Sequence, residues 1–253
     1  MTREHDRSGK FYVGLTLAIS ATAFIGFTFT YFSPMAAGAY PAVSPAIHVH
    51  GWSFFLWYIL LPLQAILMAA GYPRLHYTLG GASLLLATIM TITGLLVASV
   101  RIEHALTAGD ALGALWEKFG LVITSTLLLF VGFYIAAIVN RRRPDVHKRF
   151  MIMASASALG AATFRIIVAS GGYYWLATPA WVMPTAILIP NMFIVAGILY
   201  DLSNRRSVHP AYSVGLSVAV AVETVGLWLL DNSAGDVCRR LLAAAGHAFG
   251  FLY

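Results

Sequence analysis

The chain has 253 residues, of which 59% are hydrophobic and only 10% are charged. Soluble domains carry about 25% charged residues, so this composition excludes an ordinary water-soluble fold. The net charge is +6, but the basic residues lie in short segments between apolar runs. That pattern indicates a bilayer rather than nucleic acid as their partner. The single cysteine, Cys238, excludes an internal disulfide and any cysteine-based metal motif.

Seven apolar stretches are long enough to cross a bilayer, which needs about 20 residues per helix. They predict an all-α bundle of seven transmembrane helices, spanning residues 11–230 after a short tail at 1–10. The predicted helices are 11–32, 45–70, 79–100, 116–139, 150–170, 181–200 and 212–230. The first could instead be a signal peptide, but its apolar run exceeds the usual 7–15 or so residues, which favours an uncleaved anchor. Small residues crowd the fifth helix and predict that it packs centrally.

The distribution of Lys and Arg predicts the orientation of the bundle. Eleven of them lie in segments on the same side as the N-terminus, and three lie on the opposite side. Because basic residues are retained in the cytoplasm, we expect a cytoplasmic N-terminus. The eleven are Arg3, Arg7, Lys10, Arg74, Arg141, Arg142, Arg143, Lys148, Arg149, Arg205 and Arg206, and the three are Arg101, Arg239 and Arg240.

Residues 231–253 follow the last predicted span and are too short and too charged to form another. Apolar residues recur there at helical spacing, with Arg239, Arg240 and His247 between them. This pattern predicts an amphipathic helix lying on the outer membrane surface. A frayed tail is the alternative.

Three inner loops each place a histidine after an aliphatic residue, at the entrance of the outgoing helix. These are His76, His147 and His209, and they are expected at similar depth, with Asp201 on the same side. Imidazole and carboxylate groups are ligands for zinc or iron, and two histidines could hold a haem b iron. The alternative is that these histidines are amphipathic residues at the membrane interface.

A second polar group is predicted in the outer half of the bundle. Arg165 lies 18 residues beyond His147, about 27 Å along a straight helix, and Glu223 lies within the last span. Charges at this depth usually pair, so Arg165 with Glu223 is the expected pair, and Glu117 is the rival partner. His50 begins an inward-facing stripe on the second helix and is expected near this group. Together, they could hold propionates or a quinone head.

The loop Arg142-Arg143-Pro144-Asp145-Val146-His147-Lys148-Arg149-Phe150-Met151 resembles that of a group of uncharacterised bacterial multi-pass membrane proteins. Their loop reads basic-basic-Pro-x-x-His-Lys-Arg-x-Met, and the resemblance covers about helices 2 to 7. In that group, basic residues often follow the first histidine, where this chain has Tyr77 and Thr78. The chain is more distantly similar to small membrane proteins associated with haem–copper oxidases. The resemblance implies a bacterial inner membrane and a respiratory complex as partner.

These observations leave three functions open, and they do not indicate a reaction, so whether the chain is an enzyme stays undecided. The first is a redox protein that binds haem or a metal through His76, His147 and His209. The second is a proton-coupled transporter that uses Glu223 and Arg165. The third is a membrane assembly protein in which the charges only hold helices together. No phosphate-binding loop, zinc-protease motif or serine-hydrolase elbow occurs in the sequence.

Overall fold

The computed structural model describes residues 2–108, 111–173 and 178–253, with side chains from 8–107, 117–173 and 178–253. Within these ranges the chain consists of helices and their connections, with no β-strand, so the all-α prediction is confirmed. The described residues form six helices that are long and apolar enough to cross a membrane. A bent helix pair makes a seventh if it counts as one span. The chain is therefore a multi-pass membrane protein.

The long helices overlap the predicted spans, and several extend beyond them at one or both ends. Helix α1 (Thr2–Phe27) continues through a π-helical segment, η1 (Thr28–Phe32), into α2 (Ser33–Ala36). The next three are α3 (Pro45–Ala69), α4 (Pro73–Ala108) and α5 (Ala111–Val139). The rest are α6 (Pro144–Ser157), α7 (Gly160–Ser170), α8 (Val182–Leu188), α9 (Asn191–Arg205) and α10 (Pro210–Trp228), then η3 (Leu229–Asp231), α11 (Ser233–Phe249) and η4 (Gly250–Leu252). Four of these helices begin at a proline, whose fixed φ and missing N–H suit the first helical position.

Two of the predicted continuous helices are broken. The predicted helix 150–170 divides into α6 and α7, which meet at an angle of 46°. At the break the backbone N–H of Leu159 donates to Ala156 instead of Ser155, and the freed carbonyl of Ser155 accepts from the Tyr58 hydroxyl (3.1 Å). A side chain that takes over a helix carbonyl in this way is a known cause of kinks. The predicted helix 181–200 divides into α8 and α9 at Pro190, which lacks the N–H that a continuous helix needs.

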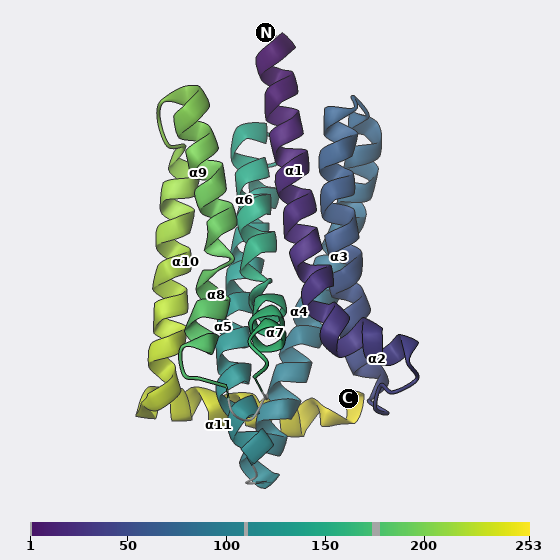
Figure 1. The fold of residues 1–253 in the computed structure, drawn as a ribbon, viewed down its shortest axis with the longest axis vertical. Coiled ribbons are helices and arrows are strands. Elements are labelled where there is room, and N and C mark those ends of the chain that lie inside the picture. The colour runs from purple at the N-terminus through teal and green to yellow at the C-terminus, as the bar shows by residue number, and fades with distance from the viewer. Residues whose placement is uncertain (1, 109–110, 174–177) are drawn as a thin grey trace.

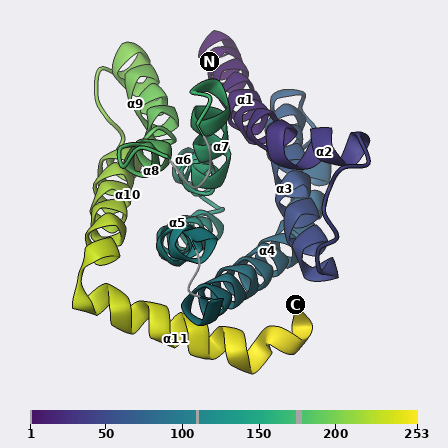
Figure 2. The ribbon, with the colours of Figure 1, turned by 60° about the horizontal axis from the view of Figure 1, so that its bottom comes forward.

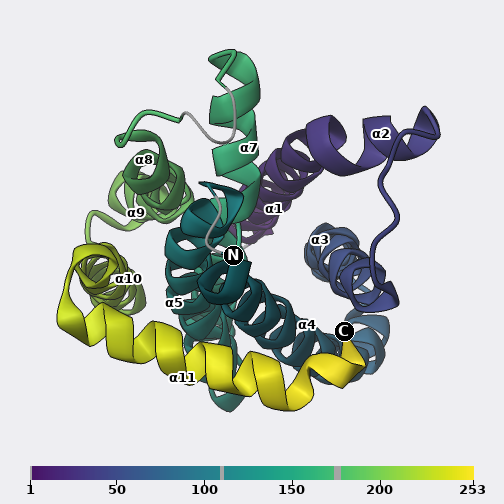
Figure 3. The same ribbon diagram turned by 90° about the horizontal axis from the view of Figure 1, so that it is seen from below.

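The helices form a bundle in which α6 packs centrally, against α1, α5, α9 and α10. The connections α3–α4, α5–α6 and α9–α10 lie at the same end as the N-terminus, at the top of Figure 1. Helix α11 lies across the opposite end, roughly perpendicular to the bundle (Figures 1 and 2). Seen from below, α7 bends away from α5 and α10 (Figure 3).

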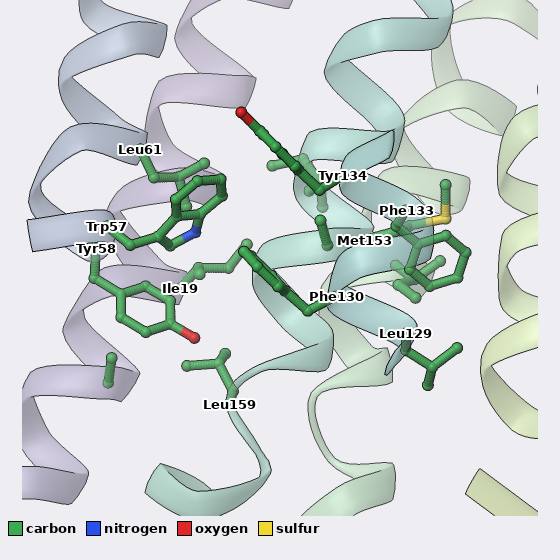
Figure 4. Packing of buried hydrophobic residues seen from close by; sticks show 14 of the residues in the cluster. Ile19, Trp57, Tyr58, Leu61, Leu129, Phe130, Phe133, Tyr134, Met153 and Leu159 are labelled. Carbon is green, nitrogen blue, oxygen red and sulfur yellow. The ribbon is translucent and has the colours of Figure 1, made fainter. Parts of the chain in front are cut away.

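The main core lies where α1, α3, α5 and α6 meet. Trp57 and Tyr58 of α3 face Phe130 of α5 and Leu159 at the α6–α7 break (Figure 4). The Trp57 indole N–H donates to the hydroxyl of Ser155 (3.1 Å), so the small polar residue of α6 satisfies a buried donor. The first half of the predicted fifth span, α6, is therefore central, whereas its second half, α7, bends away from α5 and α10.

Candidate functional site

Two of the three predicted inner histidines lie side by side. The rings of His76, in the first turns of α4, and His147, in the first turn of α6, have centroids 6.3 Å apart at 90°. The Nδ1 atom of His147 lies 2.9 Å from the carbonyl oxygen of Ala137. Because a carbonyl only accepts, Nδ1 must carry a proton, and Nε2 of a neutral His147 has a lone pair.

His76 is held from α3 by an amide. With the amide nitrogen oriented toward His76, the Gln64 side chain donates to Nδ1 of His76 (2.6 Å) and accepts from the backbone N–H of Gly80 (3.0 Å). Nδ1 of His76 is then the acceptor, so in the neutral ring Nε2 carries the proton. Gln64 therefore has partners in the bundle, as a polar residue at this depth requires.

His209 does not join this pair. Its Nδ1 accepts from the backbone N–H of Ala211 (3.1 Å) and caps α10, while Nε2 lies 3.0 Å from a carboxylate oxygen of Asp145. Both ring nitrogens are therefore used. Within the described residues, no group of three or more His, Cys, Asp or Glu side chains could hold a metal ion. The residues do not fit the predicted site of three histidines and Asp201.

Asp201 instead forms a buried ion pair with Arg149. The Arg149 side chain is 2% exposed and that of Asp201 is 0% exposed. Nε of Arg149 donates to Oδ2 of Asp201 (3.0 Å), Nη2 donates to Oδ1, and Nη1 donates to the carbonyl oxygen of Asp145 (2.5 Å). This bidentate ion pair joins α6 to α9. Sequence analysis missed it because Arg149 was assigned to a loop.

Aromatic residues extend this ion pair toward α1. The Arg149 guanidinium lies over the ring of Tyr212 (5.4 Å), and the Tyr212 hydroxyl lies 3.4 Å from that of Tyr12. Lys148 lies over the Tyr12 ring (4.4 Å) and donates to Ser8 (3.0 Å). These contacts attach α1 to α6 and α10 at the inner end of the bundle.

Glu223, in the interior of α10, is 1% exposed. One of its carboxylate oxygens accepts from the side-chain amide of Asn191 (2.6 Å), the first residue of α9 after the break at Pro190. The predicted pairing of Glu223 with Arg165 is thus replaced by a hydrogen bond to an uncharged amide.

Arg165 lies on α7 and faces α1. Nε donates to the hydroxyl of Thr30 (2.8 Å), Nη1 donates to the carbonyl of Ala161 (2.7 Å), and the guanidinium covers the ring of Phe27 (4.4 Å). The prediction assumed one straight helix from His147 to Arg165. The 46° bend turns α7 toward α1 and η1, whereas α10 packs on α5, α6, α8 and α9.

The other predicted outer residues also have partners. Nδ1 of His50 lies 3.3 Å from the hydroxyl of Thr93 on α4, and Nδ1 of His48 lies 3.0 Å from the hydroxyl of Tyr31 in η1. Glu117, the rival partner, accepts from Nε of Arg239 in α11 (2.9 Å). His50, Arg165 and Glu223 therefore form hydrogen bonds with different partners on different helices. The structure does not bring these three residues together in one hydrogen-bonded cluster.

The two helix breaks and Glu223 share one depth. Ala158 lies 14 residues from the start of α6, Asn191 lies 14 residues from the end of α9, and Glu223 lies 13 residues from the start of α10. At 1.5 Å per residue, each is about 20 Å from the inner end of its span. The hydroxyl of Thr163 donates to the carbonyl of Ala186, so the outer halves of the two broken spans are also joined.

Comparisons with protein-family models, with curated proteins and with solved structures find no match to this chain.

Proposed function

We propose that the protein is a proton-coupled membrane transporter in which Glu223 carries the proton. The observation that supports this proposal is the position of a buried carboxylic acid near the middle of the bundle, at the depth of the bend between α6 and α7 and of the interruption between α8 and α9. A charged residue in the middle of a span costs about 3 kcal/mol on insertion scales. Ionisable groups at such depth typically mark ion and proton pathways.

Broken helices support the same proposal. An interrupted span leaves backbone carbonyls and amides without helical partners, and membrane proteins tolerate this where protein or a water-filled cavity satisfies these groups. Discontinuous helices near the midplane form the substrate and ion sites of many secondary transporters. Here Asn191, the first residue of α9 after Pro190, donates to Glu223, so we expect protonation of the acid to change this contact between α10 and α9. A neutral carboxyl and a carboxylate accept differently from that amide.

The experiment measures solute-driven proton movement in energised inside-out vesicles that contain the protein. A pH-sensitive dye reports the gradient while a panel of inorganic cations, organic cations and small carboxylates is added. We expect that at least one class dissipates the gradient with wild-type protein, and that Glu223→Gln abolishes this response at equal protein abundance. Asn191→Ala should reduce the response without abolishing it, since the acid remains.

Asp231→Asn is the matched control, because Asp231 is a carboxylate at the end of the same span with a side chain that is 80% exposed. It should transport like the wild type. Full activity of Glu223→Gln would contradict the proposal. Loss of abundance in Glu223→Gln, with no proton movement in the wild type, would instead favour the assembly function.

We also propose a second candidate, haem binding by His76 and His147, which the adjacent rings favour. Metal-ligating histidines usually donate their other ring nitrogen to a carbonyl or a similar group, as His147 does to Ala137. The Gln64 amide donates to Nδ1 of His76, which opposes this arrangement for that ring. Haem would supply electron-transfer chemistry. Purified wild-type protein with a Soret band that His147→Ala removes would favour this candidate, and protein without the band would remove it.

A further inference from the structure

Helix α11 has three distinct faces. The face against α4 and α5 carries Gly235, Arg239 and Gly246, all of which are buried. A polar face, about a quarter of a turn away, carries charged and imidazole side chains that are exposed. The face opposite the bundle is apolar and exposed. Its members are Val237, Leu241, Ala244 and Ala248.

The apolar face exposes large hydrophobic side chains, which are unfavourable in contact with water. Leu241 is 67% exposed and Val237 is 49% exposed. The last span also exposes apolar side chains near its outer end, at Val225 and Trp228. Because α11 lies across the bundle and not along it, this surface follows one level of the molecule (Figures 1 and 2). Such an amphipathic helix is suited to the boundary between acyl chains and headgroups.

Contacts between α11 and the long helices fix that level. Gly246 packs against the backbone of Ser99 on α4, so closely that a Cβ would lie 2.4 Å from the Ser99 carbonyl oxygen. Arg239 bonds Glu117 on α5 (2.9 Å). Helix α4 continues for nine residues beyond Ser99, roughly 13 Å.

Helix α4 is long enough for part of it to lie outside the hydrocarbon core. Its 36 residues span roughly 54 Å, while the hydrocarbon core is about 30 Å thick. Beyond Ser99 the sequence becomes polar, with Arg101, Glu103 and His104 in succession. His104 has a side chain that is 70% exposed. Charged residues of this kind belong in water and not among acyl chains.

We propose that α11 lies in the plane of the outer leaflet, with its apolar face toward acyl chains, and that the end of α4 beyond it, residues 100–108, projects into the outer aqueous phase. The occupant of the apolar face is therefore phospholipid. In this arrangement α11 fixes how deeply the bundle sits in the bilayer. The ion pair between Arg239 and Glu117 holds α11 at a fixed position along α5. The inference does not depend on the proposed transport function.

Site-directed spin labelling tests this proposal in vesicles of phosphatidylcholine and phosphatidylglycerol. In a Cys238→Ala background, single cysteines replace Leu241 and Ala248 on the apolar face and Arg240 on the polar face. All three positions are exposed, so the label should not disturb folding. We expect labels at 241 and 248 to collide mainly with oxygen, which concentrates in the bilayer. The label at 240 should collide mainly with a water-soluble nickel chelate.

A fourth label, at His104, should be as accessible to the nickel chelate as the label at 240. Equal nickel accessibility at 240, 241 and 248 would overturn the proposal, because α11 would then lie in water. Low accessibility to both reagents at 241, with spin–spin coupling between copies, would also overturn it and would identify a second copy of the chain as the occupant. A label at 104 that collides mainly with oxygen would contradict the projecting end of α4.

Discussion

At the scale of single residues, the inner end of the bundle depends on the pair formed by Arg149 and Asp201. Both side chains are almost completely inaccessible, so each charge depends on the other for compensation. Taking two charges out of water is costly, and their attraction repays that cost only when the geometry is good and the remaining donors are satisfied. Here the third guanidinium nitrogen, Nη1, donates to the carbonyl of Asp145, and the Tyr212 ring covers the cation. The pair therefore holds α6 and α9 in one register.

Replacing one member of this pair should be strongly destabilising. We expect Arg149→Ala to lower the free energy of unfolding by about 3–5 kcal/mol, because it leaves the Asp201 carboxylate buried without its partner. Thermal unfolding of the detergent-solubilised protein measures this. The double substitution Arg149→Met with Asp201→Leu should recover most of the loss, since it removes both charges and keeps the volume.

The exposed pair of Lys118 and Asp231 is the matched control. Lys118→Ala should change the free energy of unfolding by less than about 1 kcal/mol, because solvent screens a surface pair. A similar cost for Lys118→Ala and Arg149→Ala would show that the buried pair has no special role.

Sequence reasoning could find these charges but not their partners. The apolar runs marked Glu223 and Arg165 as intramembrane residues, and both do lie within helices of the bundle. Their predicted pairing failed because it depended on straight helices, and the bend before α7 redirects Arg165 by 46°. Arg149 was hidden for another reason. It follows four other basic residues in the sequence, so it had the pattern of a loop cation that marks orientation.

At the scale of helices, the close approach of α1 to α7 depends on a glycine. A Cβ on Gly26 would lie 2.4 Å from the carbonyl oxygen of Ala162, and backbone cannot move aside as a side chain can. Small residues permit this kind of contact between membrane helices. The contact holds α7 against α1 after the break, and thereby brings Arg165 within reach of Thr30.

Gly26→Ala should therefore lower the stability of the bundle. We expect a loss of about 1–3 kcal/mol from overpacking, measured as a lower midpoint of thermal unfolding. Gly14→Ala on the same helix is the control, because nothing lies within 4 Å of its added Cβ. Alanine has the higher helix propensity, so this control should be neutral or gain up to about 1 kcal/mol. Equal losses at both positions would contradict the role of the α1–α7 contact.

The helices themselves were largely predictable, and their interruptions were not. Apolar length predicts the six long apolar helices and the bent pair α6–α7, although it does not show whether that pair is one span. Pro190 lies within a predicted span, but prolines are common in membrane helices, and Pro62 leaves α3 unbroken. The break between α6 and α7 depends on a hydrogen bond from Tyr58, which is 97 residues away from Ser155 in sequence. The local sequence around Ser155 cannot predict a contact with a residue so far away in the chain.

At the scale of the whole molecule, we expect the charges at its two ends to determine its orientation in the membrane. The three inner connections and the N-terminus share one end of the bundle, and α11 occupies the other (Figure 1). The burial of Arg149 removes one cation from the inner count, and the pairing of Arg239 with Glu117 removes one from the outer count. The excess of basic residues at the N-terminal end therefore persists, and it should retain that end in the cytoplasm.

Cysteine labelling tests this orientation without altering any charge. In a Cys238→Ala background, Ser207→Cys lies in the α9–α10 connection and Thr107→Cys lies near the outer end of α4, and both positions are exposed. We expect a membrane-impermeant maleimide to label Thr107→Cys in right-side-out vesicles and Ser207→Cys only in inside-out vesicles. The reverse pattern would invert the assigned topology and place α11 in the cytoplasmic leaflet. Labelling of both cysteines in both preparations, with intact vesicles, would mean that the chain inserts in two orientations. The basic loops would then not determine the orientation of the chain.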